Sequence, residues 1–135
     1  MILKNGRFLL RRSIAEMGDD AAREAFRDFY IRKGQEKLAR RVMGLTAKVG
    51  VTVKEVRVRD LGYRWASCNV HGKLAFHWKC IMAPFRIIDY IVAHELCHLH
   101  HRDHTQAFWN EIDKVMPDYQ ERKAWLRENG ASMNL

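Results

Sequence analysis

The sequence contains only two prolines and three cysteines among its 135 residues, and no long apolar run. Spanning a bilayer takes ~20 consecutive apolar residues, so a membrane protein is excluded. Residues 1–12 lack the small-residue cleavage site of a secretory signal peptide. Repeats, linkers and low-complexity segments are absent as well. The composition therefore predicts one globular domain over residues 1–135.

The cysteines do not form a recognisable pattern. Cys68, Cys80 and Cys97 lack the CxxC spacing of zinc ribbons and redox sites, and their odd number does not suit a disulfide framework. Thiols left unpaired are typical of a reducing compartment, so a cytoplasmic location is expected.

Positive charge is concentrated in the first part of the chain. Residues 1–59 hold 15 of the 24 lysines and arginines but only 7 of the 16 acidic residues, whereas residues 60–135 are balanced. Six of these basic residues lie between positions 32 and 48, on the face opposite to the apolar stripe of the helical segment expected between Gly18 and Gly50. Such a face is most simply a solvated helix surface, and it can also contact nucleic-acid phosphates.

Hydrophobic periodicity predicts helices and strands in mixed order. Asn5-Gly6 between apolar residues predicts a β-hairpin over residues 2–9. Apolar residues at three- and four-residue steps between Gly18 and Gly50 predict one long helix, or two in series interrupted at Gly34. Alternating residues over 51–80 predict a three-stranded antiparallel meander. The fold class is therefore α+β.

Three further helices are predicted in the second half of the chain. A helix that starts at Pro84 is apolar on too many faces for a surface helix, so it is expected to be buried. Residues 103–106 resemble a capping box that opens a helix through Met116. A last helix starts at Pro117-Asp118 and stops at Asn129-Gly130.

The segment His94-Glu95-Leu96-Cys97-His98 lies on the predicted buried helix. Residues four apart lie on one helix face, so both imidazoles can bind one metal ion. Glu95 is rotated by about 100° from His94, and it can hold a water at that metal. This HExxH pattern predicts a catalytic zinc site with Glu95 as the general base.

Catalytic zinc needs a third protein ligand. If the helix stops near His101, the chain turns, and His104 at the start of the next helix can aim back at the metal. His104 is therefore the favoured ligand, with His101 in reserve. The remaining candidates are His100, Asp103 and Glu111.

Other interpretations of these residues are open. The histidines could be satisfied in the core by hydrogen bonds alone, or hold a structural zinc, although structural sites usually have four ligands. Cys97 points away from His98 and is expected in the core. The same is expected of the aromatic residues Trp65, Phe76, Trp78, Phe108 and Trp109.

Five motifs in one order resemble the YgjP-like predicted metal-dependent hydrolases, relatives of the SprT-like zincin metallopeptidases. They cover about residues 35–130 and comprise Arg64–Cys68, Gly72–Trp78, Asp89–His98, His104 with Phe108-Trp109, and Pro117–Tyr119. Two departures stand out. Ala66 replaces the usual Gly, and members commonly have a longer β-rich N-terminal region, of which residues 1–12 would be a remnant.

The resemblance implies a zincin-like fold in which the small β-meander packs with an active-site helix and flanking helices. It also implies zinc held by His94, His98 and His104, with Glu95 as the catalytic base. The expected reaction is peptide-bond hydrolysis by a zinc-activated water, and the substrate strand is expected to add along Leu74–His77.

The developing oxyanion must also be stabilised. Arg64 and His101 are the main candidates, with Tyr63 and His77 as further ones. Arg64 could equally form an ion pair that fastens the strand to the helix.

Two other functions are open. One is a nucleic-acid-associated zinc module that uses the basic residues 32–48, and the other is a metal-dependent hydrolase of small amides. A narrow, closed pocket would favour the small-amide hydrolase, whereas an open groove favours peptides.

Overall fold

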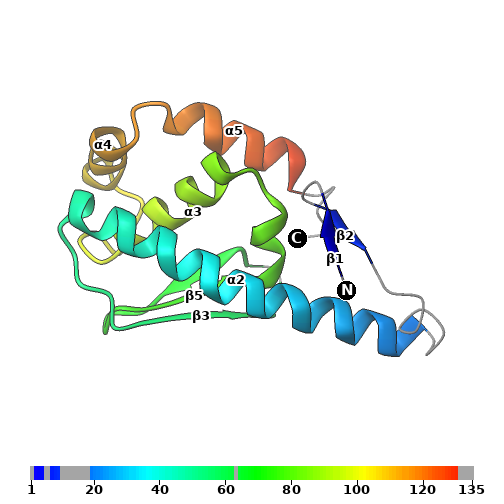
Figure 1. The fold of residues 1–135 in the computed structure, drawn as a ribbon. Coiled ribbons are helices and arrows are strands. Elements are labelled where there is room, and N and C mark those ends of the chain that lie inside the picture. Colours follow the sequence, from blue (N-terminus) through cyan, green and yellow to red (C-terminus); the bar gives the residue numbers. More distant parts are fainter. Residues whose placement is uncertain (1, 5–6, 10–18, 63, 131–135) are drawn as a thin grey trace.

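The computed structural model describes residues 2–4, 7–9, 19–62 and 64–130, which form a mixed α+β arrangement (Figure 1). The predicted α+β class is thus confirmed. The helices are α2, α3, α4 and α5, with one short 3-10 helix, and the strands are β1 to β5. In chain order they are β1 (Ile2–Lys4), β2 (Arg7–Leu9), α2 (Asp19–Val49), β3 (Glu55–Arg59), β4 (Ala66–Cys68), β5 (Lys73–His77), the 3-10 helix (Trp78–Met82), α3 (Phe85–Cys97), α4 (Gln106–Val115) and α5 (Tyr119–Asn129).

The predicted N-terminal hairpin is present. Strands β1 and β2 pair antiparallel in a two-stranded sheet of their own, with Leu3 opposite Phe8. The turn residues Asn5 and Gly6 lie outside the described residues.

The main sheet differs from the predicted meander. Its strand order is β3-β5-β4, and β3 runs parallel to β5, whereas β4 runs antiparallel to it. The alternation of side chains identifies which residues form strands and which face is buried, but it does not identify the neighbouring strand. Leu74 and Phe76 of β5 are almost fully buried, which places β5 in the centre. The prediction that Leu74–His77 forms a sheet edge is therefore wrong.

The two edges of this sheet differ in what covers them. On β3, the Gln35 side-chain amide of α2 donates to the Val56 carbonyl, and its oxygen accepts from the Val58 N–H at 2.9 Å. Helix α2 thereby satisfies two backbone groups on the outer side of β3. Among the described residues no strand pairs with the outer side of β4, so β4 is the edge that can accept another strand.

Helix α2 is continuous over 31 residues, so Gly34 does not interrupt it. Gly34 instead lets the helix approach the sheet closely, because a Cβ placed there would lie 3.2 Å from a Val58 methyl and 3.8 Å from Ile81. The helix ends before Gly50, whose φ of +77° is the left-handed conformation of a helix C-terminal glycine.

This close packing predicts opposite effects for two glycines of α2. Gly34→Leu is expected to lower the free energy of unfolding by about 1–3 kcal/mol, because a large side chain must displace Val58 or the helix. Gly44 has no neighbour within 4 Å, so Gly44→Leu is expected to raise stability by about 0.5–1 kcal/mol through helix propensity. Urea denaturation of both variants tests this, and equal effects at both positions would contradict it.

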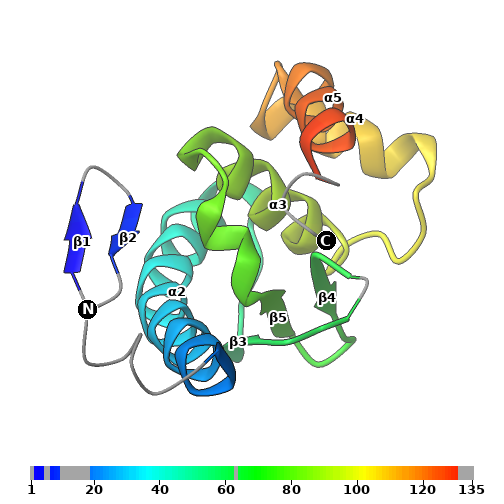
Figure 2. The same cartoon turned by 90° about the vertical axis from the view of Figure 1, so that its right-hand side faces the viewer.

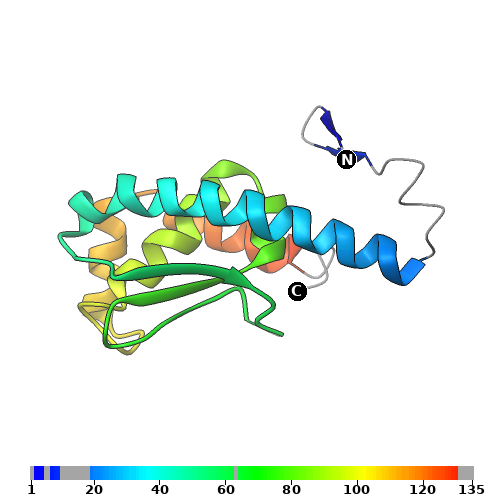
Figure 3. The same ribbon diagram turned by 60° about the horizontal axis from the view of Figure 1, so that its bottom comes forward.

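Helix α3 lies at the centre of the domain. It contacts α2, α4, α5 and β4, and Ile87, Ile88, Val92 and Leu96 are almost inaccessible to solvent. Figures 2 and 3 show α2 and α3 over the same face of the main sheet, with α4 and α5 beyond α3. The predicted buried helix is thus confirmed. No helix in the described part of the chain is long and apolar enough to cross a membrane.

Candidate metal centre

Two histidines lie at the end of the buried helix α3. His94 is in its last turn, and His98 is its C-terminal cap, with a right-handed φ of −66°. The helix ends at Cys97, earlier than the predicted stop near His101, yet the four-residue spacing still places both rings on one face. His94 and His98 rings lie 4.9 Å apart between centroids.

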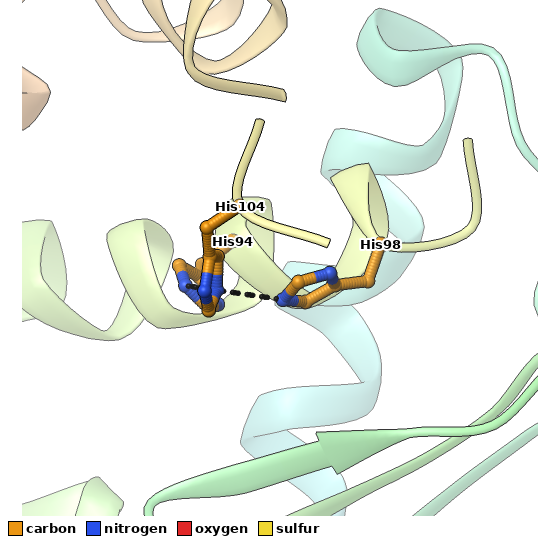
Figure 4. Close-up of side chains that lie close together, drawn as sticks. All are labelled: His94, His98 and His104. Atoms are coloured by element: carbon orange, nitrogen blue, oxygen red, sulfur yellow. Dashed lines mark hydrogen bonds between the residues drawn. The ribbon is translucent and has the colours of Figure 1, made fainter. Parts of the chain in front are cut away.

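His104 completes a cluster with these two residues. The chain turns after α3, and His104 comes just before Thr105, whose hydroxyl caps α4 by accepting from the Phe108 N–H at 3.3 Å. Of the predicted capping box, Thr105 rather than Asp103 makes the cap. His104 Nε2 lies 3.1 Å from His94 Nε2 and 3.1 Å from His98 Nε2 (Figure 4).

The protonation of the rings follows from their outer partners. His98 Nδ1 lies 2.9 Å from the His101 carbonyl, which can only accept, so Nδ1 carries the proton. His94 Nδ1 lies 3.3 Å from the Glu95 carboxylate and is the donor there. Both Nε2 atoms therefore present lone pairs towards the centre of the cluster.

These lone pairs fit a metal ion. A proton on His104 Nε2 can point to only one of its two neighbours, so at least one of the two contacts at 3.1 Å brings two electron-rich nitrogens together without a hydrogen bond. A cation bound at the centre removes this repulsion. Burial, followed by the neighbouring His94 and His98, lowers the pKa of His104, which keeps its imidazole in the neutral form that binds metals.

Aromatic side chains of α4 and α5 fix the orientation of the rings. Phe108 stacks on His98 with a centroid distance of 4.6 Å, and Trp109 stacks on His104 at 5.7 Å. Trp109 in turn stacks on Tyr119 of α5 at 5.6 Å. Phe76 and Phe108 are fully buried as predicted, whereas Trp65, Trp78 and Trp109 are partly buried and pack against the core.

A second group of polar residues fastens the turn between His98 and His104. Glu111 of α4 accepts from His100 Nδ1 at 3.0 Å, and His101 Nε2 lies 3.6 Å from the same carboxylate. The His101 ring thus faces Glu111, whereas its carbonyl orients His98. Neither His101, the reserve ligand, nor Glu111 joins the cluster of ligand atoms.

Glu111 is therefore expected to support metal binding from outside the cluster. Glu111→Ala should weaken the affinity for a metal ion, measured with zinc as the probe, by about 10–100-fold, the usual range for groups that orient metal ligands. Competition with a chromogenic chelator measures this, and Asp113→Ala, an exposed site on the same helix, is the matched control. Equal zinc affinities in the two variants would show that Glu111 does not orient the turn.

Glu95 is 7% exposed and lies beside a pocket of about 310 Å³. This pocket also contains His94 and Arg64, so the structure brings the predicted base, one predicted ligand and one predicted oxyanion stabiliser together. Its other walls are mainly apolar: Trp65, Ala66, Tyr90, Ile91 and Leu126.

Tyr90 was not predicted from the sequence as a residue of this pocket. It lies one turn before His94, a spacing that would have placed it on the same face of α3. Burial raises the pKa of Tyr90 to about 12, so its phenol stays protonated and remains a hydrogen-bond donor.

Other candidates lie outside the pocket. His77 caps the 3-10 helix through Nδ1 and contacts Asp60 through Nε2 at 3.3 Å, so both ring nitrogens have structural partners. Tyr63 lies outside the described residues. Burial raises the pKa of Cys80 and Cys97 to about 12, so these buried thiols stay protonated, and Cys97 is in the core as predicted.

Comparisons with known proteins agree with the resemblance of the motifs. The family model described as YgjP-like, metallopeptidase domain, matches residues 2–129. No curated protein matches the chain. The crystal structure of the metallopeptidase zymogen of Pyrococcus abyssi abylysin is similar in fold, with a TM-score of 0.60 and 22% identity over 67% of this chain and 93% of that chain. Because the family match spans nearly the whole sequence, this chain belongs to the YgjP-like metallopeptidase family.

Proposed function

We propose that this protein is a zinc-dependent peptidase whose metal ion is held by His94, His98 and His104. The observation that carries the proposal is the convergence of three Nε2 atoms, all within 4.8 Å of one another. Three histidines are a usual ligand set for catalytic zinc, and they leave a fourth position open. Membership of a metallopeptidase family supports the same function.

When bound, a zinc ion supplies Lewis-acid chemistry, since it polarises a peptide carbonyl and lowers the pKa of water. The protein supplies the proton transfers. Glu95 lies next to His94 at the pocket, where its carboxylate can accept a proton from the attacking water and then donate it to the leaving amine.

Stabilisation of the oxyanion is proposed for Arg64, because its side chain lines the same pocket as Glu95. The protonated Tyr90 phenol is a second donor at this pocket. His101 stays a prediction, and the contact of its ring with Glu111 argues for a positioning role instead.

The substrate is proposed to bind as a strand along β4. The Trp65 carbonyl accepts from the His77 N–H at 2.8 Å, and the Asn69 backbone N–H donates to the Lys73 carbonyl at 3.1 Å. Because hydrogen bonds in an antiparallel pair alternate, the backbone groups of Ala66 point away from β5. A peptide paired there would pass the Glu95 pocket, of which Ala66 is a wall.

The overall architecture is proposed to be zincin-like, with residues 1–135 acting as one peptidase domain. The similarity of fold to abylysin supports this proposal. The edge of β4 beside the pocket favours an extended peptide over a small amide.

No finding supports nucleic-acid contact through residues 32–48. Part of this basic face is engaged within the chain. Lys37 and Arg41 lie over the Phe85 ring, and Arg40 pairs with Glu36.

Removal and return of the metal tests the proposed function. A strong chelator is expected to abolish cleavage of an unstructured protein substrate, and one equivalent of zinc is expected to restore it. Metal analysis before and after the treatment is the control. Undiminished cleavage by the zinc-free protein would rule out the proposed mechanism.

A further inference from the structure

Within the described residues, no helix covers the face of the main sheet opposite to α2 and α3 (Figures 1 and 3). Strand register places Arg57 of β3, Ala75 of β5 and Ser67 of β4 in one row across the sheet. Neighbouring residues in register point to the same face. The small side chains of Ala75 and Ser67 thus leave a depression in this face beside longer side chains such as that of Arg57.

This depression belongs to a groove of about 570 Å³, which we call the cationic groove. Four basic side chains and one acidic side chain line it. They are Arg57, Arg59, Arg64, Lys73 and Glu55.

The single carboxylate does not balance the positive charge. Glu55 pairs with Arg57, and Lys73 Nζ lies 4.0 Å from it. In the described part of the chain, Arg59 and Arg64 have no salt bridge. The groove therefore has an excess of positive charge, which favours an anionic partner.

The cationic groove adjoins the proposed active site. Arg64 lines both the groove and the Glu95 pocket, and β4 runs between them. In a peptide strand paired with β4, side chains would alternate between the helix-covered face and the groove face. A peptide in the Glu95 pocket can therefore also extend over the cationic groove.

We propose that the cationic groove binds an acidic segment of the peptide substrate, next to the bond that is cleaved. This inference rests on the proposed function and specifies its substrate class. The apolar walls of the Glu95 pocket suit an apolar side chain, and the groove suits aspartate or glutamate near it in the sequence. Selectivity of this kind depends on electrostatic complementarity.

The residues of the groove favour an acidic peptide over nucleic acid. None of its lining residues is aromatic, so bases have no side chain on which to stack. Glu55 would in addition repel a phosphate backbone, whereas an extended peptide can place its carboxylates beside Arg59 and away from Glu55.

The test compares two peptides that differ only in charge, one with a run of Asp and Glu and one with Asn and Gln in their place. Both carry a fluorophore and the same apolar residue, and binding to the zinc-loaded Glu95→Gln protein is followed by anisotropy. At about 0.15 M ionic strength, the acidic peptide is expected to bind about tenfold more tightly. The double variant Arg57→Gln/Arg59→Gln should remove most of this difference.

A matched control removes two charges elsewhere. Arg32 and Lys48 are exposed on α2, which covers the other face of the sheet, so Arg32→Gln/Lys48→Gln should keep the preference for the acidic peptide. Equal binding of both peptides, or an equal loss in both double variants, would overturn the proposal. Tighter binding of a single-stranded oligonucleotide that is lost in the Arg57→Gln/Arg59→Gln protein would also overturn it, in favour of nucleic acid.

Cleavage by the protein with Glu95 intact separates this inference from the proposed function. If both peptides are cleaved with equal KM, the proposed function stands and the acidic preference fails. If neither peptide nor an unstructured protein is cleaved while the charge-dependent binding persists, the peptidase proposal fails and the groove remains a site for acidic peptides.

Discussion

Glu95→Gln is expected to lower kcat for peptide hydrolysis by about 10²–10⁴-fold, the range that general acid–base catalysis contributes. Glutamine has nearly the same shape, so it can keep the contact with His94 Nδ1. It cannot accept and return a proton, which lowers kcat, whereas the retained contact with His94 should keep the zinc content at one ion per chain. Single-turnover cleavage together with metal analysis measures both effects.

Glu128→Gln is the matched control, because Glu128 is exposed on α5 and its replacement removes the same charge. Its activity is expected to equal that of the parent protein. Full activity in Glu95→Gln would remove Glu95 from the mechanism. A loss of zinc in this variant would instead assign Glu95 a role in holding the site together.

The second large effect is expected for His104→Ala. Structural zinc ions with four protein ligands are bound with about 10–16 kcal/mol, or about 2.5–4 kcal/mol per ligand, so the loss of His104 should lower the affinity by about 10²–10³-fold. His104 precedes α4 and is exposed, so its loss should not disturb the core. Chelator competition and circular dichroism check the affinity and the fold.

His71→Ala provides the comparison for this variant. His71 is exposed in the turn before β5, away from the residues of the cluster, so its replacement should leave zinc affinity unchanged. If His104→Ala binds zinc as tightly as His71→Ala, His104 is not a ligand and the third position must be filled by another residue.

Local rules predicted the helical part of the site. The four-residue spacing of His94 and His98 depends only on helix geometry, and the turn that brings His104 back is short. His104 was therefore predicted correctly as a neighbour of the other two. The role of Glu111 was not predicted, because its contact with His100 joins the turn after α3 to a residue of α4 eleven positions further along the chain.

Such local rules did not predict the strand order of the main sheet. Alternation along residues 51–80 indicated strands, and in β3 the buried Val58 between the exposed Arg57 and Arg59 follows it, whereas β5 is buried from Leu74 to His77. The order β3-β5-β4 did not follow, because the pairing of strands depends on which apolar surfaces bury one another after the whole chain has collapsed. The candidate edge for the substrate strand is therefore β4, and the predicted Leu74–His77 lies in the centre of the sheet.

The sequence by itself determined the local features of the candidate site: the HExxH segment, its place on a buried helix and its family motifs. Helix periodicity is set within a few residues, so these features need no knowledge of distant contacts. Only the tertiary structure decided that Arg64 lies beside Glu95, that β4 is the open edge, and that four basic side chains share one groove. These relations join residues from separate elements, and long-range packing alone brings them together.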